Sequence, residues 1–278
     1  TASEAVRGDY FDRLCRRRRT RFEIEIRDAG MLRFGEFPPG CFQRIEMCRI
    51  VGIGDLDALH RLMGNPDGEL YKLYASALEE YGIHLIGQGV GTFRGLFNNK
   101  HKVAVPEDME DLTMRIYEDP VVKYFWAPIC NASVISFNEV YTALQTKTCN
   151  AMEIAAGVGI YSKFYEVCDH YSNIDWQFMS QGFLVSDKCW NTLPEDLRQI
   201  VVDCAWESAE YEWGLEKEFA EQAMDELATL GCEVYELTDE ERQAWVDYSQ
   251  SHAEEFREYI GADFYDQVME IVEADAAA

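Results

Sequence analysis

Arg115 is the residue whose type and position point most clearly to chemistry. It lies in the short segment Leu112–Tyr117, where apolar and polar residues alternate weakly as in a β-strand, and Asp119-Pro120 then gives a turn signal. A guanidinium buried in such a strand is costly unless an anion faces it. With 25 Lys and Arg against 51 Asp and Glu, a cation placed there stands out. The simplest interpretation is an internal salt bridge, and the alternative is a site for an anionic ligand.

Residues that could support catalysis do not form a recognisable pattern. No H-E-x-x-H, G-x-S-x-G or P-loop motif occurs, and His170 follows Cys168 too closely in sequence for a Cys/His nucleophile pair. The run Gly87-Gln-Gly89-Val-Gly91 lacks the third glycine of a dinucleotide loop, so we interpret these glycines as points where backbones approach closely. The sequence therefore predicts no catalytic residue, no metal site and no cofactor.

The strong negative charge limits the partners of the chain. A net charge of −26 over 278 residues argues against nucleic acid and anionic membrane surfaces, and it favours a monomer. No apolar run reaches the roughly 18 residues of a membrane span. The sequence opens without the charged and apolar regions of a signal peptide, so we expect a processed or truncated start, or else a cytoplasmic protein.

The nine cysteines include no C-x-x-C pair, which argues against a zinc ribbon or a thioredoxin motif. Their odd number leaves at least one unpaired, and their apolar flanks predict small buried side chains. One disulfide remains possible, but the sequence does not identify it.

The elements that must position Arg115 alternate between strands and helices, which predicts an α/β fold. We expect strands at 22–27, 84–87, 112–117, 176–186 and 232–237, and helices at 1–20, 57–63, 68–80, 160–167 and from about 195 to 230. Asn150–Glu153 is expected to form a turn. Ser136-x-x-Glu139, Thr192-x-Pro-Glu195 and Thr238-x-x-Glu241 are expected to form helix-capping boxes.

Three further segments, in this order and spacing, carry a family resemblance. Phe137–Thr146, Tyr161–Val167 and Trp190–Leu197 resemble the solute-binding proteins of tripartite ATP-independent periplasmic (TRAP) transporters. The resemblance runs from about Phe22 to the C-terminus and is strongest over residues 94–200.

The resemblance implies a two-lobed periplasmic binding protein fold, type II-like, with a ligand cleft between the lobes and a long helix spanning both. Lobe I would comprise residues 1–92 and 181–218, and lobe II residues 93–180 and 219–278. The family's first strand would precede Thr1, and a cleft segment near Gly52–Asp55 is shorter than expected.

The resemblance also assigns site residues. The arginine matching Arg115 makes a bidentate bridge to a ligand carboxylate in the family, Arg94 matches a second arginine near the ligand, and Phe137 matches a cleft aromatic. Arg94 could instead stabilise the hinge, and Phe137 could be a core residue. After Gln145-Thr146 the family commonly shows a glycine and then D-G-Q-E-N-P, where this chain has residues 147–155, so Ile154 stands where the family often has a ligand-contacting asparagine.

That replacement makes a polyhydroxylated acid less suitable as a ligand. Ile154, together with Met152, Trp176 and Phe178, suggests a more apolar pocket that suits an aromatic or branched carboxylate, although each could equally be core. We therefore expect a periplasmic or otherwise extracytoplasmic solute-binding protein that delivers a small organic anion to TRAP membrane permease subunits and does no chemistry. Two alternatives are a sensory ligand-binding module of the same fold and a degenerate enzyme.

Overall fold

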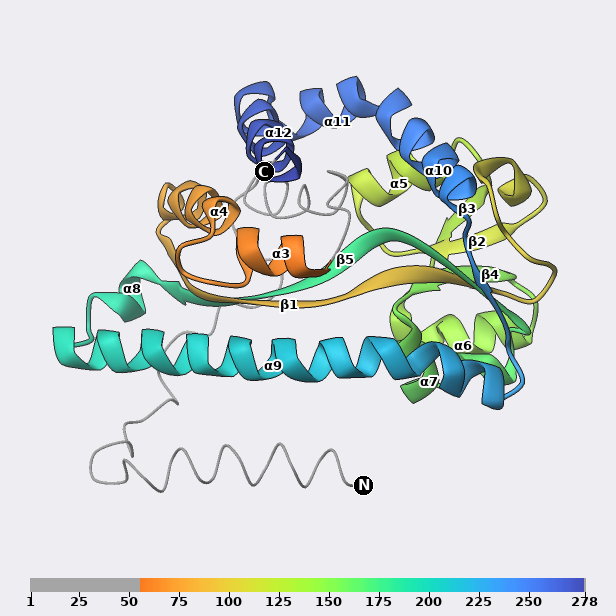
Figure 1. Ribbon diagram of the computed structural model, residues 1–278, viewed down its shortest axis with the longest axis horizontal. Coiled ribbons are helices and arrows are strands. Elements are labelled where there is room, and N and C mark those ends of the chain that lie inside the picture. The colour runs from red at the N-terminus through yellow and green to blue at the C-terminus, as the bar shows by residue number, and fades with distance from the viewer. Residues whose placement is uncertain (1–55, 278) are drawn as a thin grey trace. The chain divides into compact units, whose positions relative to one another are not determined.

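The sheet that carries Arg115 has six strands in the order β3-β2-β4-β1-β5-β6, in a computed structural model that describes residues 56–277 (Figure 1). The strands are β1 (Ile83–Asn98), β2 (Thr113–Ile116), β3 (Asn131–Val134), β4 (Ala151–Ile154), β5 (His170–Ser186) and β6 (Glu233–Glu236). The helices are α3 (Leu56–Met63), α4 (Glu69–Glu79), α5 (Pro120–Trp126), α6 (Phe137–Gln145), α7 (Ala156–Tyr161), α8 (Asp187–Trp190), α9 (Glu195–Thr229), α10 (Asp239–Ser251), α11 (Ala253–Ile260) and α12 (Ala262–Ala276). This mixture confirms the predicted α/β class.

Strands β1 and β5 form a long antiparallel pair across the centre of the sheet (Figure 1). Their register shifts near Arg94, where β5 carries extra residues opposite β1. Asp175 in this irregular stretch has a φ of 48°, a left-handed conformation that aspartate tolerates better than most residues. Its carboxylate forms an ion pair with Arg242 in α10, 2.5 Å away. The bulge is thus tied to a helix outside the sheet.

The parallel part of the sheet holds the arginine. β2 pairs with β3 and with β4, and Arg115 is opposite Met152 of β4. All four residues of β4 are buried, because β1 and β2 flank this strand on both sides. Asn150, just before β4, accepts a hydrogen bond from the backbone of Thr113 through its side chain (2.8 Å) and so fixes the start of β2.

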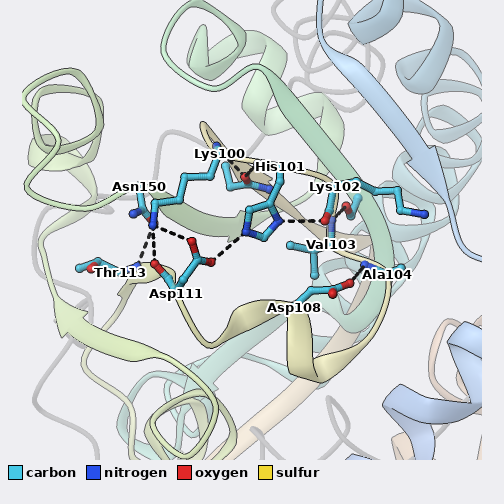
Figure 2. Close-up of polar contacts among 11 residues, drawn as sticks. Lys100, His101, Lys102, Val103, Ala104, Asp108, Asp111, Thr113 and Asn150 are labelled. Carbon is cyan, nitrogen blue, oxygen red and sulfur yellow. Dashed lines mark hydrogen bonds and ion pairs between the residues drawn. The ribbon is translucent and has the colours of Figure 1, made fainter.

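The connection between β1 and β2 is held by a polar network (Figure 2). The Asp111 carboxylate is 2.8 Å from Nε2 of His101 and accepts a hydrogen bond from Nζ of Lys100 at 2.9 Å. Nδ1 of His101 is 2.9 Å from the carbonyl oxygen of Lys102. Since both ring nitrogens face acceptors, the arrangement suits the imidazolium form. The pKa of His101 is raised, mainly by the hydrogen bond to Asp111.

Helix α9 packs along β1 and also contacts α7 and β6 (Figure 1). The close approach depends on Gly87, where an added Cβ would lie 2.9 Å from the Cβ of Ala205. This supports the interpretation of the β1 glycines as points of close approach. The helix ends one residue before the predicted Leu230, and Gly231, with a φ of 96°, terminates it as expected.

The structure differs from several local predictions. Asn150–Glu153 is not a turn but leads into β4, because pairing with two neighbouring strands overrides local turn preference. Strands β1 and β5 extend well beyond 84–87 and 176–186. The helix predicted at 160–167 is α7 followed by a separate short 3-10 turn at Phe164–Glu166.

Only one of the three predicted capping boxes forms. Thr238 and Glu241 exchange both hydrogen bonds. The side chains of Ser136 and Thr192 do not cap α6 and α9, and the Thr192 hydroxyl donates to the carbonyl of Cys189 at 2.7 Å. The helix predicted at 1–20 and the strand at 22–27 lie outside the described residues.

Two further features bear on function class. Within residues 56–277, helices long enough to cross a membrane are too polar to do so. Within residues 56–277, Cys130, Cys149, Cys168, Cys189 and Cys232 are free thiols, and those at 149, 168 and 232 are buried, as expected for small apolar side chains.

Candidate functional site

Arg115 is a buried cation with no counter-ion among residues 56–277. Only 3% of the residue is exposed, and within the described part of the chain no carboxylate lies within ion-pair distance. Its one hydrogen bond among these residues runs from Nε to the carbonyl of Ile135, at 2.9 Å. The terminal nitrogens of the guanidinium are therefore available to an anion. Burial lowers the pKa of Arg115, and the more distant charge of Glu153 opposes this effect.

Two aromatic rings lie close to this guanidinium. The Cζ atom of Arg115 is 6.0 Å from the ring centre of Tyr117 and 5.9 Å from that of Phe137. Tyr117 directly follows β2, and Phe137 begins α6, so the ends of two neighbouring elements place both rings beside the cation. Phe137 is 43% exposed, which leaves one of these rings open to solvent. The arrangement provides an apolar edge beside a positive charge.

Arg94 lies nearby but its charge is already neutralised. Its Nε donates to the carboxylate of Glu153, and its terminal nitrogen donates to the backbone oxygen of the same residue at 3.1 Å. Its Cζ is 5.7 Å from the ring centre of Tyr117, so this ring lies near both arginines. Of the two predicted arginines, Arg94 has a carboxylate partner in Glu153, whereas Arg115 has none among the described residues.

Glu153 is a site residue that the sequence analysis missed. It has no exposed surface, and its Oε2 accepts hydrogen bonds from Arg94 and, at 3.4 Å, from the indole of Trp176. Its other oxygen, Oε1, has no hydrogen-bond partner in the part of the chain that the structure describes. A carboxylate between the apolar neighbours Met152 and Ile154 is as costly to bury as an arginine in β2, and that signal could have identified it.

The remaining predicted residues divide into two groups. Trp176 is half-buried, reaches Glu153 through its indole nitrogen, and stacks on Phe125 with ring centres 5.0 Å apart. Met152 and Ile154 are buried in one hydrophobic cluster, which includes Phe97, Phe164 and Leu227. Phe178 is buried in the other cluster. Direct ligand contacts of Met152, Ile154 and Phe178 stay predictions.

Taken together, these residues form a candidate anion-binding site. Arg115, Arg94, Phe137 and Trp176 meet around Tyr117 and Glu153, and the one uncompensated charge is that of Arg115 among these groups. A guanidinium fork in such surroundings binds a carboxylate with two parallel hydrogen bonds. Across the described residues, His, Cys, Asp and Glu side chains do not gather in groups of three or more that could hold a metal.

A buried cation beside aromatic rings suits a solute-binding protein, and the chain's relatives are of that class. The sequence model of the bacterial extracellular solute-binding proteins of family 7 (DctP) matches residues 52–259, and the chain belongs to this family. It is 30% identical over 242 residues to the C4-dicarboxylate-binding periplasmic protein DctP of Rhodobacter capsulatus, covering 86% of this chain and 71% of that protein. It spans about half the length of several other curated relatives.

Solved structures show the same fold. A TRAP periplasmic solute-binding protein from Ralstonia eutropha with bound (S)-2-acetolactate has a TM-score of 0.77 at 20% identity, covering 84% of this chain and 75% of that one. A TRAP solute-binding protein from Chromohalobacter salexigens with bound D-glucuronate has a TM-score of 0.76 at 23% identity, covering 83% and 75%. The resemblance to TRAP solute-binding proteins and the two-lobed fold are thereby confirmed. These relatives are binding proteins and not enzymes.

Proposed function

We propose that this chain captures a small organic anion, anchors its carboxylate on Arg115, and delivers it unchanged to the membrane permease of a TRAP transporter. The observation that carries the proposal is the contrast between two buried arginines. Arg94 has a carboxylate partner in Glu153, whereas Arg115 has none within the residues described. Burying most of an arginine without a carboxylate partner is costly, and a ligand carboxylate that pairs with Arg115 explains best why the residue is there.

The relatives support the class of ligand. The Rhodobacter protein is named for C4-dicarboxylates, and the two solved relatives hold 2-acetolactate and D-glucuronate, so all three ligands are carboxylates. The rings beside Arg115 favour an acid with an apolar portion, as the replacement of a family asparagine by Ile154 also does. We propose an aromatic or branched carboxylate, bound by a monomer.

The proposed place of action is the periplasm or an equivalent extracytoplasmic space. The family is periplasmic, and closure of two lobes around a ligand creates a surface that the permease subunits can recognise. Lobe I (1–92 and 181–218) and lobe II (93–180 and 219–278) remain our proposed division of the chain.

Isothermal titration calorimetry with a panel of aliphatic, branched and aromatic carboxylic acids tests the proposal. We expect at least one acid to bind in the micromolar range and to be recovered unchanged after release, as judged by mass spectrometry. Arg115→Lys keeps the charge but loses the fork, so it should weaken binding roughly 10- to 100-fold. If no acid in the panel binds, or if one is converted to product, the proposed function is wrong.

A further inference from the structure

Glu153 contains a buried oxygen that the protein itself does not satisfy. The residue has no exposed surface, and Arg94 holds its charge in an ion pair. Both hydrogen-bond donors that reach it, Nε of Arg94 and Nε1 of Trp176, converge on Oε2. Oε1 has no hydrogen-bond partner among residues 56–277. A desolvated charged acceptor left unpaired is among the costlier defects that a folded protein can carry.

The polar groups around Glu153 are otherwise occupied. The hydroxyl of Tyr117 and the amide of Gln177 hydrogen-bond to one another, with Gln177 Nε2 3.2 Å from the hydroxyl oxygen. Arg115 influences Glu153 through its charge, but its hydrogen bond goes to the carbonyl of Ile135. No neighbour among these groups therefore donates to Oε1.

This unpaired acceptor lies in the same centre as an unpaired donor. The guanidiniums of Arg115 and of Arg94, which holds Glu153, both lie within 6.0 Å of the ring centre of Tyr117. One small molecule can therefore supply a hydrogen-bond partner both to Arg115 and to Oε1 of Glu153. Its carboxylate would pair with Arg115, and a second group close to that carboxylate would pair with Glu153.

We propose that Glu153 selects ligands that carry a hydrogen-bond donor near the carboxylate, namely hydroxy or amino carboxylic acids. The inference rests on the proposed function, because it uses the same site and the same anchor at Arg115. An ionised carboxylate can only accept, so the matching ligand group must donate, and a hydroxyl or an ammonium does so. A 2-oxo acid presents an acceptor there, and a second carboxylate presents a like charge, so both leave Oε1 unpaired and are selected against.

Ligand entry must displace a covering side chain, since Glu153 is closed to solvent in this structure. Trp176 contacts the carboxylate and is itself only half-buried, which makes it the neighbour best placed to move. Its indole can release Oε2 without leaving that oxygen unpaired, because Arg94 remains bound there.

Matched pairs of acids test the proposal on the purified wild-type protein. The pairs are lactate and pyruvate, 2-hydroxy-3-methylbutanoate and 3-methyl-2-oxobutanoate, and 3-phenyllactate and phenylpyruvate, with valine and phenylalanine as amino counterparts. We expect a hydroxy or amino acid to bind at least about tenfold tighter than its 2-oxo partner in calorimetric titrations. If no donor-bearing acid binds tighter than its 2-oxo partner, the proposal is overturned.

The variant Glu153→Gln then tests whether Glu153 is responsible for the preference for hydroxy and amino acids over 2-oxo acids. Glutamine keeps an oxygen for Arg94 and gains an amide donor, so the preference should fall to parity or invert in favour of the 2-oxo acid. A thermal melt checks that the variant is folded, and an undiminished hydroxy-acid preference in a folded variant would refute the role of Glu153. Tight, Arg115-dependent binding of 2-oxo acids would remove only this inference, whereas failure of every acid to bind would remove the proposed function as well.

Discussion

Replacing Arg115 by methionine should weaken ligand binding and at the same time stabilise the ligand-free protein. Methionine has a similar length, needs no hydrogen bonds and suits the apolar surroundings of β2. The variant loses the Nε bond to the Ile135 carbonyl, which is worth roughly 1.5–3 kcal/mol for a charged donor. It also removes the cation of a residue that is only 3% exposed and has no counter-ion among residues 56–277, and burying such a charge costs several kcal/mol in proteins.

The second effect should exceed the first by about 1 kcal/mol, which raises the Tm of the ligand-free protein by roughly 2–4 °C for a chain of this size. Binding should respond in the other direction. Two charge-assisted hydrogen bonds to a carboxylate contribute about 3–6 kcal/mol, so Kd should rise about 10²- to 10⁴-fold. The assays are differential scanning calorimetry and isothermal titration calorimetry, after any co-purified ligand has been removed by partial denaturation and dialysis.

Arg257→Met is the matched control. Arg257 makes a bidentate pair with Asp266 on the surface, at 2.8 Å for both bonds, and lies in α11 away from the residues of the site. Its loss should leave Kd unchanged and should lower Tm slightly, if at all. The reasoning fails if Arg115→Met lowers Tm more than the control does, or if its Kd stays within threefold of wild type.

Three smaller predictions follow from the fold. Gly87→Val should destabilise the protein by about 1–3 kcal/mol in urea unfolding because α9 leaves no room for a side chain, whereas Gly214→Ala in the same helix, with nothing within 4 Å, should stabilise it by roughly 0.5–1 kcal/mol. Asp111 raises the pKa of His101, so the imidazolium stabilises the fold fully below the unfolded pKa of 6.5, and this contribution is lost as pH rises through the pKa of the folded state. The difference in Tm between wild type and His101→Gln should therefore shrink as pH rises. A difference in Tm that stays the same at every pH would contradict this prediction. Burial raises the pKa of Asp175 above 3.8, so its charge costs stability at neutral pH, and wild type should gain Tm relative to Asp175→Asn as pH falls toward 4, a trend that a flat difference would exclude.

The parts of the fold that follow local rules could be predicted from sequence. Helix α9 ends where Gly231 adopts a positive φ, and α10 begins at a complete capping box. The same capping pattern failed at Ser136 and Thr192, because residue types allow such bonds but tertiary packing decides where the hydroxyls point. The long strands were underestimated because their glycines and polar residues interrupt the alternation, and only long-range pairing between β1 and β5 reveals their extent.

The proposed anion-binding site shows what could not be predicted from the sequence. Arg94 and Arg115 are the same residue type, and each lies in a buried strand of the same sheet. Their partners differ because Glu153 reaches Arg94 and not Arg115, and that depends on the antiparallel pairing of β4 with β1. The sequence analysis assigned residues 150–153 to a turn, so the carboxylate that distinguishes the two arginines could not enter the argument. The function of a buried charged residue can therefore be inferred only when its partners are known. The same holds for Glu153, because the need of the ligand for a hydrogen-bond donor follows from Oε1, which has no partner among the described residues, and not from the position of Glu153 in the sequence.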